Sequence, residues 1–291
     1  MFTGTITALI TPFRKDGSID EDAFRRLITF QEENGVDAVV PCGSTGESAT
    51  LSFEEHIRVV EMAVDQVKTA KVIAGAGSNS TSEAIRLSER AEDAGADGIL
   101  SISPYYNKPT QEGIFRHYKA ITESIGIPLI LYNVPGRTAS NMTSETTLRL
   151  AELPGIAGIK EASGDLEQIK RIVRDRPSGF SVLSGDDVLT YSMMSAGCDG
   201  TISVASNCVP DRAAKLVNLC AAGKMKEALK MHEELEPLFR MLFCETNPIP
   251  LKYIMAKMGY GSGVLRLPLT ELTDKNHAAV DAVMKDMGMI T

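Results

Sequence analysis

The sequence places a lysine at the end of an apolar run, a position suited to nucleophilic chemistry. Residues 156–159 are small or apolar, Lys160 follows them, and Gly164-Asp165 supply a turn and helix-cap signal. We predict a buried strand over 156–160 that carries Lys160 to the edge of an apolar interior. Burial disfavours the charged amine and lowers its pKa, and a neutral lysine forms Schiff bases with carbonyl compounds. The alternative is a strand-end lysine that points into water.

A loop rich in glycine and hydroxyl groups follows another apolar run. In this loop Ser44 and Thr45 lie between two glycines. Glycine frees the backbone, so that several N–H groups and both hydroxyls could bind one carboxylate. An ordinary turn before a helix is the alternative.

Two further groups follow the run that ends at Tyr132. If that run is the strand next to the one carrying Lys160, the Tyr132 phenol can relay a proton beside the amine. Arg137 follows it and could bind a carboxylate through a two-pronged contact, whereas a surface arginine is the alternative. The tandem Tyr105-Tyr106 lies between prolines and predicts a rigid aromatic loop, which could also pack within the fold or at a subunit interface.

Residues that commonly bind metals or cofactors do not form a recognisable set. Asp186 and Asp187 could bind Mg²⁺, but we interpret them as helix caps because no other strand end supplies acidic ligands. The four histidines fall on predicted helices, the five cysteines form no Cys-x-x-Cys pair, and no Gly-x-Gly-x-x-Gly follows the first strand. We therefore expect amine catalysis on a carboxylate-bearing carbonyl compound, without metal or cofactor.

The elements that must position these groups alternate between short apolar runs and helical patterns. A phrase of the type Ala-Gly-x-Asp-Gly closes several helices and leads into the next run, as a βα repeat does. This order predicts a (β/α)8 TIM barrel over residues 1–224 with a C-terminal helical appendage over 225–291; a doubly wound sheet is the competitor. From residue 211 onward we expect only helices, docked and without their own chemistry. The eight predicted strands are 5–10, 38–41, 72–74, 98–101, 129–132, 156–160, 181–183 and 200–203.

Composition restricts the setting in which these residues act. The chain has 291 residues, 43% of them hydrophobic, and a formal net charge of −8. The acidic balance argues against nonspecific binding to nucleic acid or anionic membranes, and no apolar run approaches the roughly 20 residues of a membrane span. The first residues resemble a strand rather than a signal peptide, and the cysteine pattern fits a reducing compartment. We expect a cytoplasmic protein.

Taken together, six motifs resemble the 4-hydroxy-tetrahydrodipicolinate synthase family, historically dihydrodipicolinate synthase, of the class I pyruvate-dependent aldolases. The likeness covers nearly the whole chain, and the motifs are specific jointly although each is weak alone. They are the segments 43–47, 105–109, 132–138, 158–162, 184–187 and 247–250.

The resemblance implies condensation of pyruvate with L-aspartate 4-semialdehyde, the first committed step toward diaminopimelate and lysine. It implies that Lys160 forms the imine with pyruvate and that Tyr132 exchanges protons beside it. Thr45 would link Tyr132 to Tyr106 of a neighbouring subunit in a hydroxyl relay. The Ser44 and Thr45 loop would hold the pyruvate carboxylate. The implied assembly is a homotetramer built as a dimer of dimers, or a homodimer.

The remaining implied residues concern the second substrate and regulation. Arg137 would hold the semialdehyde carboxylate, and Gly185 and the carbonyl of Ile202 would line the pocket. Ser44 stands where the family usually has threonine, which keeps the hydroxyl. One alternative is a sugar-acid lyase on the same scaffold, and Arg137 argues against it. The other is a catalytically idle barrel used for regulation or as a binding scaffold, and the complete set of lysine, tyrosine and hydroxyl groups argues against that. The feedback site for lysine would comprise Ser48, Ala49, Phe53, His56, Asn79, Glu83 and Tyr105, with Phe53 replacing the histidine of many inhibited members.

Overall fold

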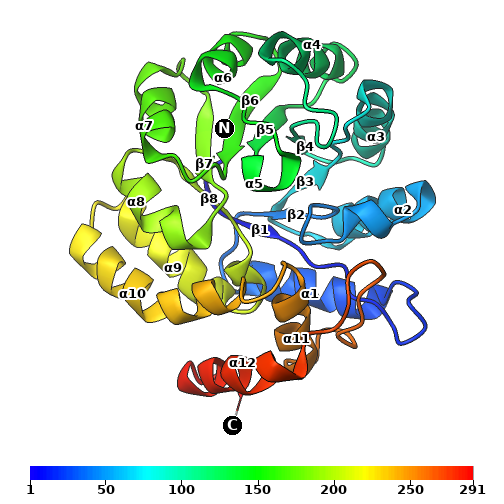
Figure 1. Ribbon diagram of the computed structural model, residues 1–291, viewed down its shortest axis with the longest axis vertical. Coiled ribbons are helices and arrows are strands. Elements are labelled where there is room, and N and C mark those ends of the chain that lie inside the picture. Colours follow the sequence, from blue (N-terminus) through cyan, green and yellow to red (C-terminus); the bar gives the residue numbers. More distant parts are fainter. Residues whose placement is uncertain (291) are drawn as a thin grey trace.

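Eight parallel strands form a closed barrel in the computed structural model, which describes residues 1–290. Each strand pairs with its neighbours in chain order, and β8 closes the barrel onto β1 (Figure 1). The barrel and the helical C-terminal segment confirm the predicted fold class. The strands are β1 Gly4–Ala8, β2 Ala38–Val40, β3 Lys71–Gly75, β4 Gly98–Ile102, β5 Leu129–Asn133, β6 Ile156–Glu161, β7 Ser181–Ser184 and β8 Gly200–Ser203.

All eight predicted strands occur, although β1 ends two residues earlier than expected. Helices connect the strands and surround the barrel (Figure 1). Short turns of helix after β2, β5 and β8 were not expected from the sequence. Around the barrel the helices are α1 Glu21–Glu33, η1 Ser48–Thr50, α2 Phe53–Gln66, α3 Thr81–Asp93, α4 Gln111–Thr122, α5 Pro135–Thr138, α6 Ser144–Ala151, α7 Leu166–Asp175, η2 Asp187–Leu189, α8 Thr190–Ser195, η3 Ala205–Asn207 and α9 Pro210–Ala221.

The strands separate two hydrophobic cores because successive side chains point to opposite faces of a strand. Inside the barrel a small core contains Ile6, Ile130, Tyr132, Leu183 and Ile202. Outside it, side chains such as those on the other face of β5 pack against the helices in a much larger cluster. The inner core places the strand-end side chains at the mouth of the barrel, where enzymes of this fold bind their substrates.

One strand pair departs from regular pairing. Leu129 pairs with Ile156, but Ile130 pairs with Gly158, so Ala157 is an extra residue on β6. Such a bulge adds a residue without ending the ladder. After the bulge the register is regular, and Tyr132 lies beside Lys160.

From the end of the barrel to residue 290, the regular structure consists of helices, as expected. α10 Met225–Met241, α11 Ile249–Lys257 and α12 Asp274–Asp286 gather at one side of the barrel (Figure 1). Their buried side chains, among them Leu235, Met255 and Met284, belong to the same cluster as the helices around the barrel. Within residues 1–290 no helix is both long and apolar enough to cross a membrane.

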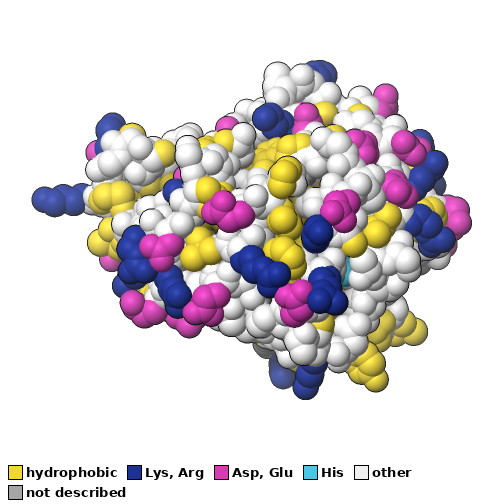
Figure 2. Space-filling view, turned by 90° about the horizontal axis from the view of Figure 1, so that it is seen from above, with side chains coloured by type: hydrophobic (Ala, Val, Ile, Leu, Met, Phe, Trp, Pro, Cys, Tyr) yellow, Lys and Arg dark blue, Asp and Glu magenta, His cyan; other side chains and the backbone are white. Residues whose placement is uncertain are grey.

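Charged side chains of both signs mix across the molecular surface. Figure 2 shows basic and acidic groups interspersed over the face in view, and many form exposed ion pairs such as Arg116 with Glu112. Exposed pairs of this kind contribute little to stability.

Candidate active site

Lys160 is buried at the mouth of the barrel, as the sequence predicts. Its side chain is 5% exposed, and Nζ lies 4.4 Å from the centroid of the Tyr132 ring on the neighbouring strand. Burial lowers the pKa of Lys160 to about 8; the Asp187 carboxylate opposes this shift and the Arg137 guanidinium adds to it. Relative to its ordinary pKa of 10.5, the fraction of neutral amine at pH 7 rises about 300-fold.

Tyr132 is suited to hold a proton next to this amine. Burial raises the pKa of its phenol to about 12, although Arg137 and a hydrogen bond with the Ser44 side chain act in the opposite direction. The phenol therefore stays protonated near neutral pH and can donate to a developing alkoxide. Lys160 and Tyr132 thus place an amine that can act as a nucleophile beside a phenol that can donate a proton.

The loop after β2 brings two hydroxyl groups to this pair in different ways. The Ser44 side chain interacts with Tyr132, whereas Thr45 Oγ1 accepts a hydrogen bond of 3.0 Å from Asn247 Nδ2. The resemblance implies that Thr45 links Tyr132 to the relay, and the Ser44 side chain is also close enough to lower the pKa of the Tyr132 phenol. Because Asn247 occupies Thr45 Oγ1 as an acceptor, the Thr45 hydroxyl keeps its hydrogen for another acceptor.

Arg137 lies at the exposed rim of the site, in the short helix α5. Its Nη2 donates a hydrogen bond of 3.1 Å to the backbone carbonyl of Asn247. Asn247, which is 5% exposed and lies between α10 and α11, therefore contacts both Thr45 and Arg137 from the C-terminal segment. We expected no chemistry from that segment. No signal in the sequence pairs Asn247 with residues so distant in the chain, although it lies in one of the six family motifs.

Gly185, which follows β7, leaves space for the lysine side chain. A Cβ atom at this position would lie 2.8 Å from Ala162 Cβ and 3.0 Å from Lys160 Cε and Cγ. These separations are too short for carbon atoms, so only glycine allows Lys160 its present conformation. Ile202 on β8 is fully buried in the inner core.

Tyr106 lies apart from these groups within one chain. Its side chain is 88% exposed, and its backbone has a φ of 72°, a left-handed conformation that is uncommon for tyrosine. Within residues 1–290 no hydrogen bond joins its hydroxyl to Ser44 or Tyr132. Its backbone N–H donates to Thr138 O over 3.3 Å, which ties the aromatic loop to α5.

The two acids after β7 act mainly through backbone contacts. Asp186 caps η2 by accepting from Val188 N, as expected. Asp187 Oδ2 accepts from Val204 N and Ala205 N, both at 2.9 Å, and so fixes the end of β8. No group of three or more His, Cys, Asp or Glu side chains within residues 1–290 is arranged to hold a metal.

The residues of the implied lysine site lie in η1, at the start of α2, around the start of α3 and after β4. His56 Nε2 donates to Gly75 O over 2.7 Å, and burial lowers the pKa of this imidazole. Glu83 accepts a hydrogen bond from Ser78 Oγ. Phe53 stacks under the Arg86 guanidinium at 4.1 Å.

A closed (β/α)8 barrel with a buried lysine beside a tyrosine at its mouth is the arrangement expected of a Schiff-base lyase. The profile of the dihydrodipicolinate synthetase family matches residues 1–287. A 4-hydroxy-tetrahydrodipicolinate synthase from Syntrophus aciditrophicus is 53% identical over 291 residues, covering 100% of both chains. The chain belongs to the dihydrodipicolinate synthetase family, as its motifs suggested.

Solved structures agree with this assignment. A chloride-inhibited dihydrodipicolinate synthase from Acinetobacter baumannii, complexed with pyruvate, is 42% identical with a TM-score of 0.98, covering 100% of both chains. A lysine-bound counterpart from Cyanidioschyzon merolae is 41% identical with a TM-score of 0.97, covering 99% of both chains. The comparisons confirm the enzyme class expected from the sequence.

Proposed function

We propose that this chain is the 4-hydroxy-tetrahydrodipicolinate synthase of its host and condenses pyruvate with L-aspartate 4-semialdehyde at Lys160. The observation that carries the proposal is the buried Lys160 amine, with a pKa of about 8, facing the Tyr132 ring. Lys160 Nζ attacks the ketone carbon of pyruvate and water leaves, which gives an imine. Loss of a methyl proton gives an enamine, and its carbon attacks the aldehyde of the second substrate.

The surrounding groups have separate roles in this proposal. The Thr45 hydroxyl, whose oxygen already accepts from Asn247, donates its hydrogen to the pyruvate carboxylate. Ser44 and Tyr132 form the chain's part of the proton relay. Arg137 binds the carboxylate of the semialdehyde at the rim, and Gly185 and the carbonyl of Ile202 line the pocket. The pyruvate complex of the A. baumannii relative supports the choice of first substrate.

Two measurements test this function. A coupled assay with pyruvate and L-aspartate 4-semialdehyde should show turnover. Incubation with pyruvate followed by borohydride should leave a mass adduct on the peptide that contains Lys160. Lys252, which is also buried with a pKa of about 8, serves as an internal control and should stay unmodified. No adduct, or an adduct on another lysine, would refute the proposal.

We also propose that Tyr106 completes the relay of a neighbouring subunit, in a homodimer or in a tetramer built from two dimers. Its high exposure within one chain supports this role. The test mixes Lys160→Met chains with Tyr106→Phe chains. A hybrid dimer then holds one site with an intact lysine and an intact tyrosine, so activity should return on mixing. Failure to regain activity in verified hybrids would place the Tyr106 hydroxyl outside the site.

Feedback inhibition by lysine is the third part of the proposal. Glu83 offers a carboxylate to a ligand ammonium group, and the lysine complex of the C. merolae relative supports a site in this family. Titration of the purified enzyme with lysine should lower its rate, and Glu83→Gln should weaken the effect. Unchanged activity at millimolar lysine would remove this part alone.

A further inference from the structure

The loop that carries Ser44 and Thr45 ends on a buried carboxylate held by the C-terminal segment. Glu47 has a left-handed backbone with a φ of 54°, and its side chain is fully buried. It forms an ion pair with Lys252 of α11, whose side chain is only 2% exposed. Lys252 Nζ also donates to Val264 O over 3.0 Å and lies 3.8 Å from the centroid of the Phe13 ring. The ammonium group therefore has several partners, and Glu47 is the charged one.

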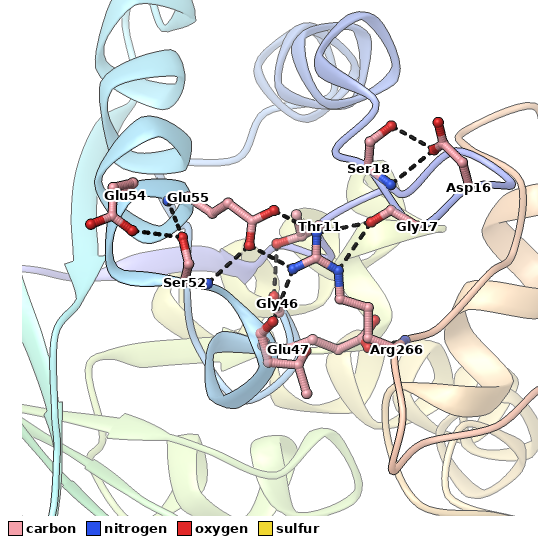
Figure 3. A network of polar contacts seen from close by, with 11 residues as sticks. Thr11, Asp16, Gly17, Ser18, Gly46, Glu47, Ser52, Glu54, Glu55 and Arg266 are labelled. Atoms are coloured by element: carbon pink, nitrogen blue, oxygen red, sulfur yellow. Dashed lines mark hydrogen bonds and ion pairs between the residues drawn. The ribbon is translucent and has the colours of Figure 1, made fainter.

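Arg266 strengthens the same connection from the segment between α11 and α12. Its backbone N–H donates to Glu47 Oε2 over 3.1 Å. Its guanidinium makes two hydrogen bonds of 2.6 Å to the Glu55 carboxylate and further bonds to Gly17 O and Thr50 O. Figure 3 shows this guanidinium between Glu55 and Gly17, with Glu47 adjacent. The C-terminal segment therefore contacts both ends of the stretch that runs from Glu47 to Glu55 in α2.

Little slack separates Glu47 from Thr45. Gly46 is the one residue between them, and its carbonyl accepts a hydrogen bond of 2.7 Å from Thr11 Oγ1. A Cβ atom at Gly46 would lie 3.1 Å from Leu9 O and 3.2 Å from Cys42 N, so the peptide is closely packed. Two residues span at most about 7 Å of chain. We therefore expect a displacement of Glu47 to move the hydroxyl groups of Ser44 and Thr45 as well.

We propose that Glu47 and Lys252 are positioning residues that hold the Ser44–Thr45 loop in the conformation that binds the substrate carboxylate. The proposal rests on the proposed function for the identity of that carboxylate. Removing one partner leaves an uncompensated buried charge. Because the pair is enclosed, the remaining charge reaches water when the loop moves away from its seat. The barrel then keeps its fold while the binding loop loses its geometry.

The test compares Lys252→Met with Met284→Ala. Met284 is fully buried in α12, and its truncation destabilises the C-terminal segment without touching the pair. Lys252→Met should raise the pyruvate concentration needed for half-maximal borohydride trapping by roughly 10-fold, since small misplacements of binding groups are costly. Hydrogen exchange of amides 43–50 should also accelerate by roughly 10-fold, in line with local opening. Met284→Ala, assayed well below its melting temperature, should show neither effect.

A second variant tests whether the two residues act as one unit. Glu47→Gln should resemble Lys252→Met, and the double variant should weaken trapping no more than the more damaging single change. Two results would overturn the proposal that the pair positions the loop. One is a trapping effect in the double variant equal to the product of the two single effects. The other is equal hydrogen exchange of amides 43–50 in Lys252→Met and Met284→Ala. The exchange measurement needs no substrate. Absence of trapping in the unmodified protein would instead refute the proposed function.

Discussion

The surroundings of the two buried lysines differ although burial lowers the pKa of both to about 8. Lys160 lies against the Tyr132 ring and forms no ion pair within residues 1–290. Lys252 is paired with Glu47 and bonded to a backbone carbonyl. The amine at the barrel mouth has partners that can exchange protons with a substrate. The amine under the loop has partners that hold it in place.

This comparison shows that a lowered pKa is not by itself a sign of catalysis. Burial is the dominant cause for both lysines, but the opposing charges are different. Asp187 partly offsets the pKa shift of Lys160, and one of its carboxylate oxygens accepts hydrogen bonds from two backbone N–H groups after β8. Glu47 directs its carboxylate at Lys252 and at the Arg266 backbone. The two sites therefore differ in whether a carboxylate forms an ion pair with the amine: Glu47 does so with Lys252, whereas Asp187 forms none with Lys160 within residues 1–290.

The largest expected difference between the two lysines is in turnover. Lys160→Met removes the proposed nucleophile, so the rate should fall by roughly 10⁶-fold or to the limit of detection. Lys252→Met should retain measurable turnover, because Lys160 and Tyr132 remain. The coupled assay measures both variants. If folded Lys160→Met and folded Lys252→Met lost activity equally, the two lysines would not differ in their importance for turnover.

The next largest effect is on the free energy of unfolding, and its sign should differ. Lys252→Met leaves the buried Glu47 carboxylate without its ion-pair partner and should cost about 3–5 kcal/mol. Lys160→Met removes an amine that burial penalises and should stabilise by on the order of 1–3 kcal/mol at pH 7. Urea unfolding of both variants checks this prediction, and a destabilised Lys160→Met protein would contradict it.

The sign of the pH dependence follows from the direction of the shift at Lys160. Its pKa falls from 10.5 unfolded to about 8 folded, so the unfolded chain binds more protons between these values. The penalty of burying the amine is complete below pH 8 and disappears as the pH rises to 10.5. The stability gained by Lys160→Met should therefore shrink over that interval.

The rate of imine formation should follow the same ionisation. At subsaturating pyruvate the trapping rate should rise with pH and level off above about 8, where the amine is neutral. Lys252→Met should lower the rate without moving this midpoint. Rapid borohydride quenching across a pH series measures it, and a midpoint near 10.5 would mean that Lys160 is not desolvated in the working enzyme.

The smallest effect is expected for a lysine of the same helix that lies at the surface. Lys257 pairs with Asp281 at 2.9 Å, and both side chains are about one-third exposed. Lys257→Met should change the free energy of unfolding by less than about 1 kcal/mol and leave trapping unchanged. A large change in stability or trapping in Lys257→Met would show that α11 is sensitive to the loss of any charged side chain. The effect of Lys252→Met could then not be attributed to its ion pair with Glu47.

The fold and the burial of Lys160 were predictable because both follow from local patterns. An apolar run that ends on Lys160 marks a buried strand, and the repeated βα phrase marks the barrel. The split between Ser44 and Thr45 was not predictable, since adjacent hydroxyls in a glycine-rich loop point in directions that φ and ψ decide. Asn247 and Lys252 were also missed, because their partners lie some 200 residues away. Nothing in the local sequence of α11 distinguishes Lys252 from Lys257.

The bulge at Ala157 determines where β6 can change in length during evolution without displacing Lys160. Ala157 is surplus to the pairing of β5 with β6, and the register from Gly158 to Lys160 is regular beyond it. A mutation that deletes Ala157 would leave Tyr132 paired with Lys160. A deletion between Gly158 and Lys160 would instead turn the amine toward the helices, because neighbouring strand residues face opposite sides. We therefore expect natural relatives to tolerate deletions in this strand before Gly158 but not between Gly158 and Lys160.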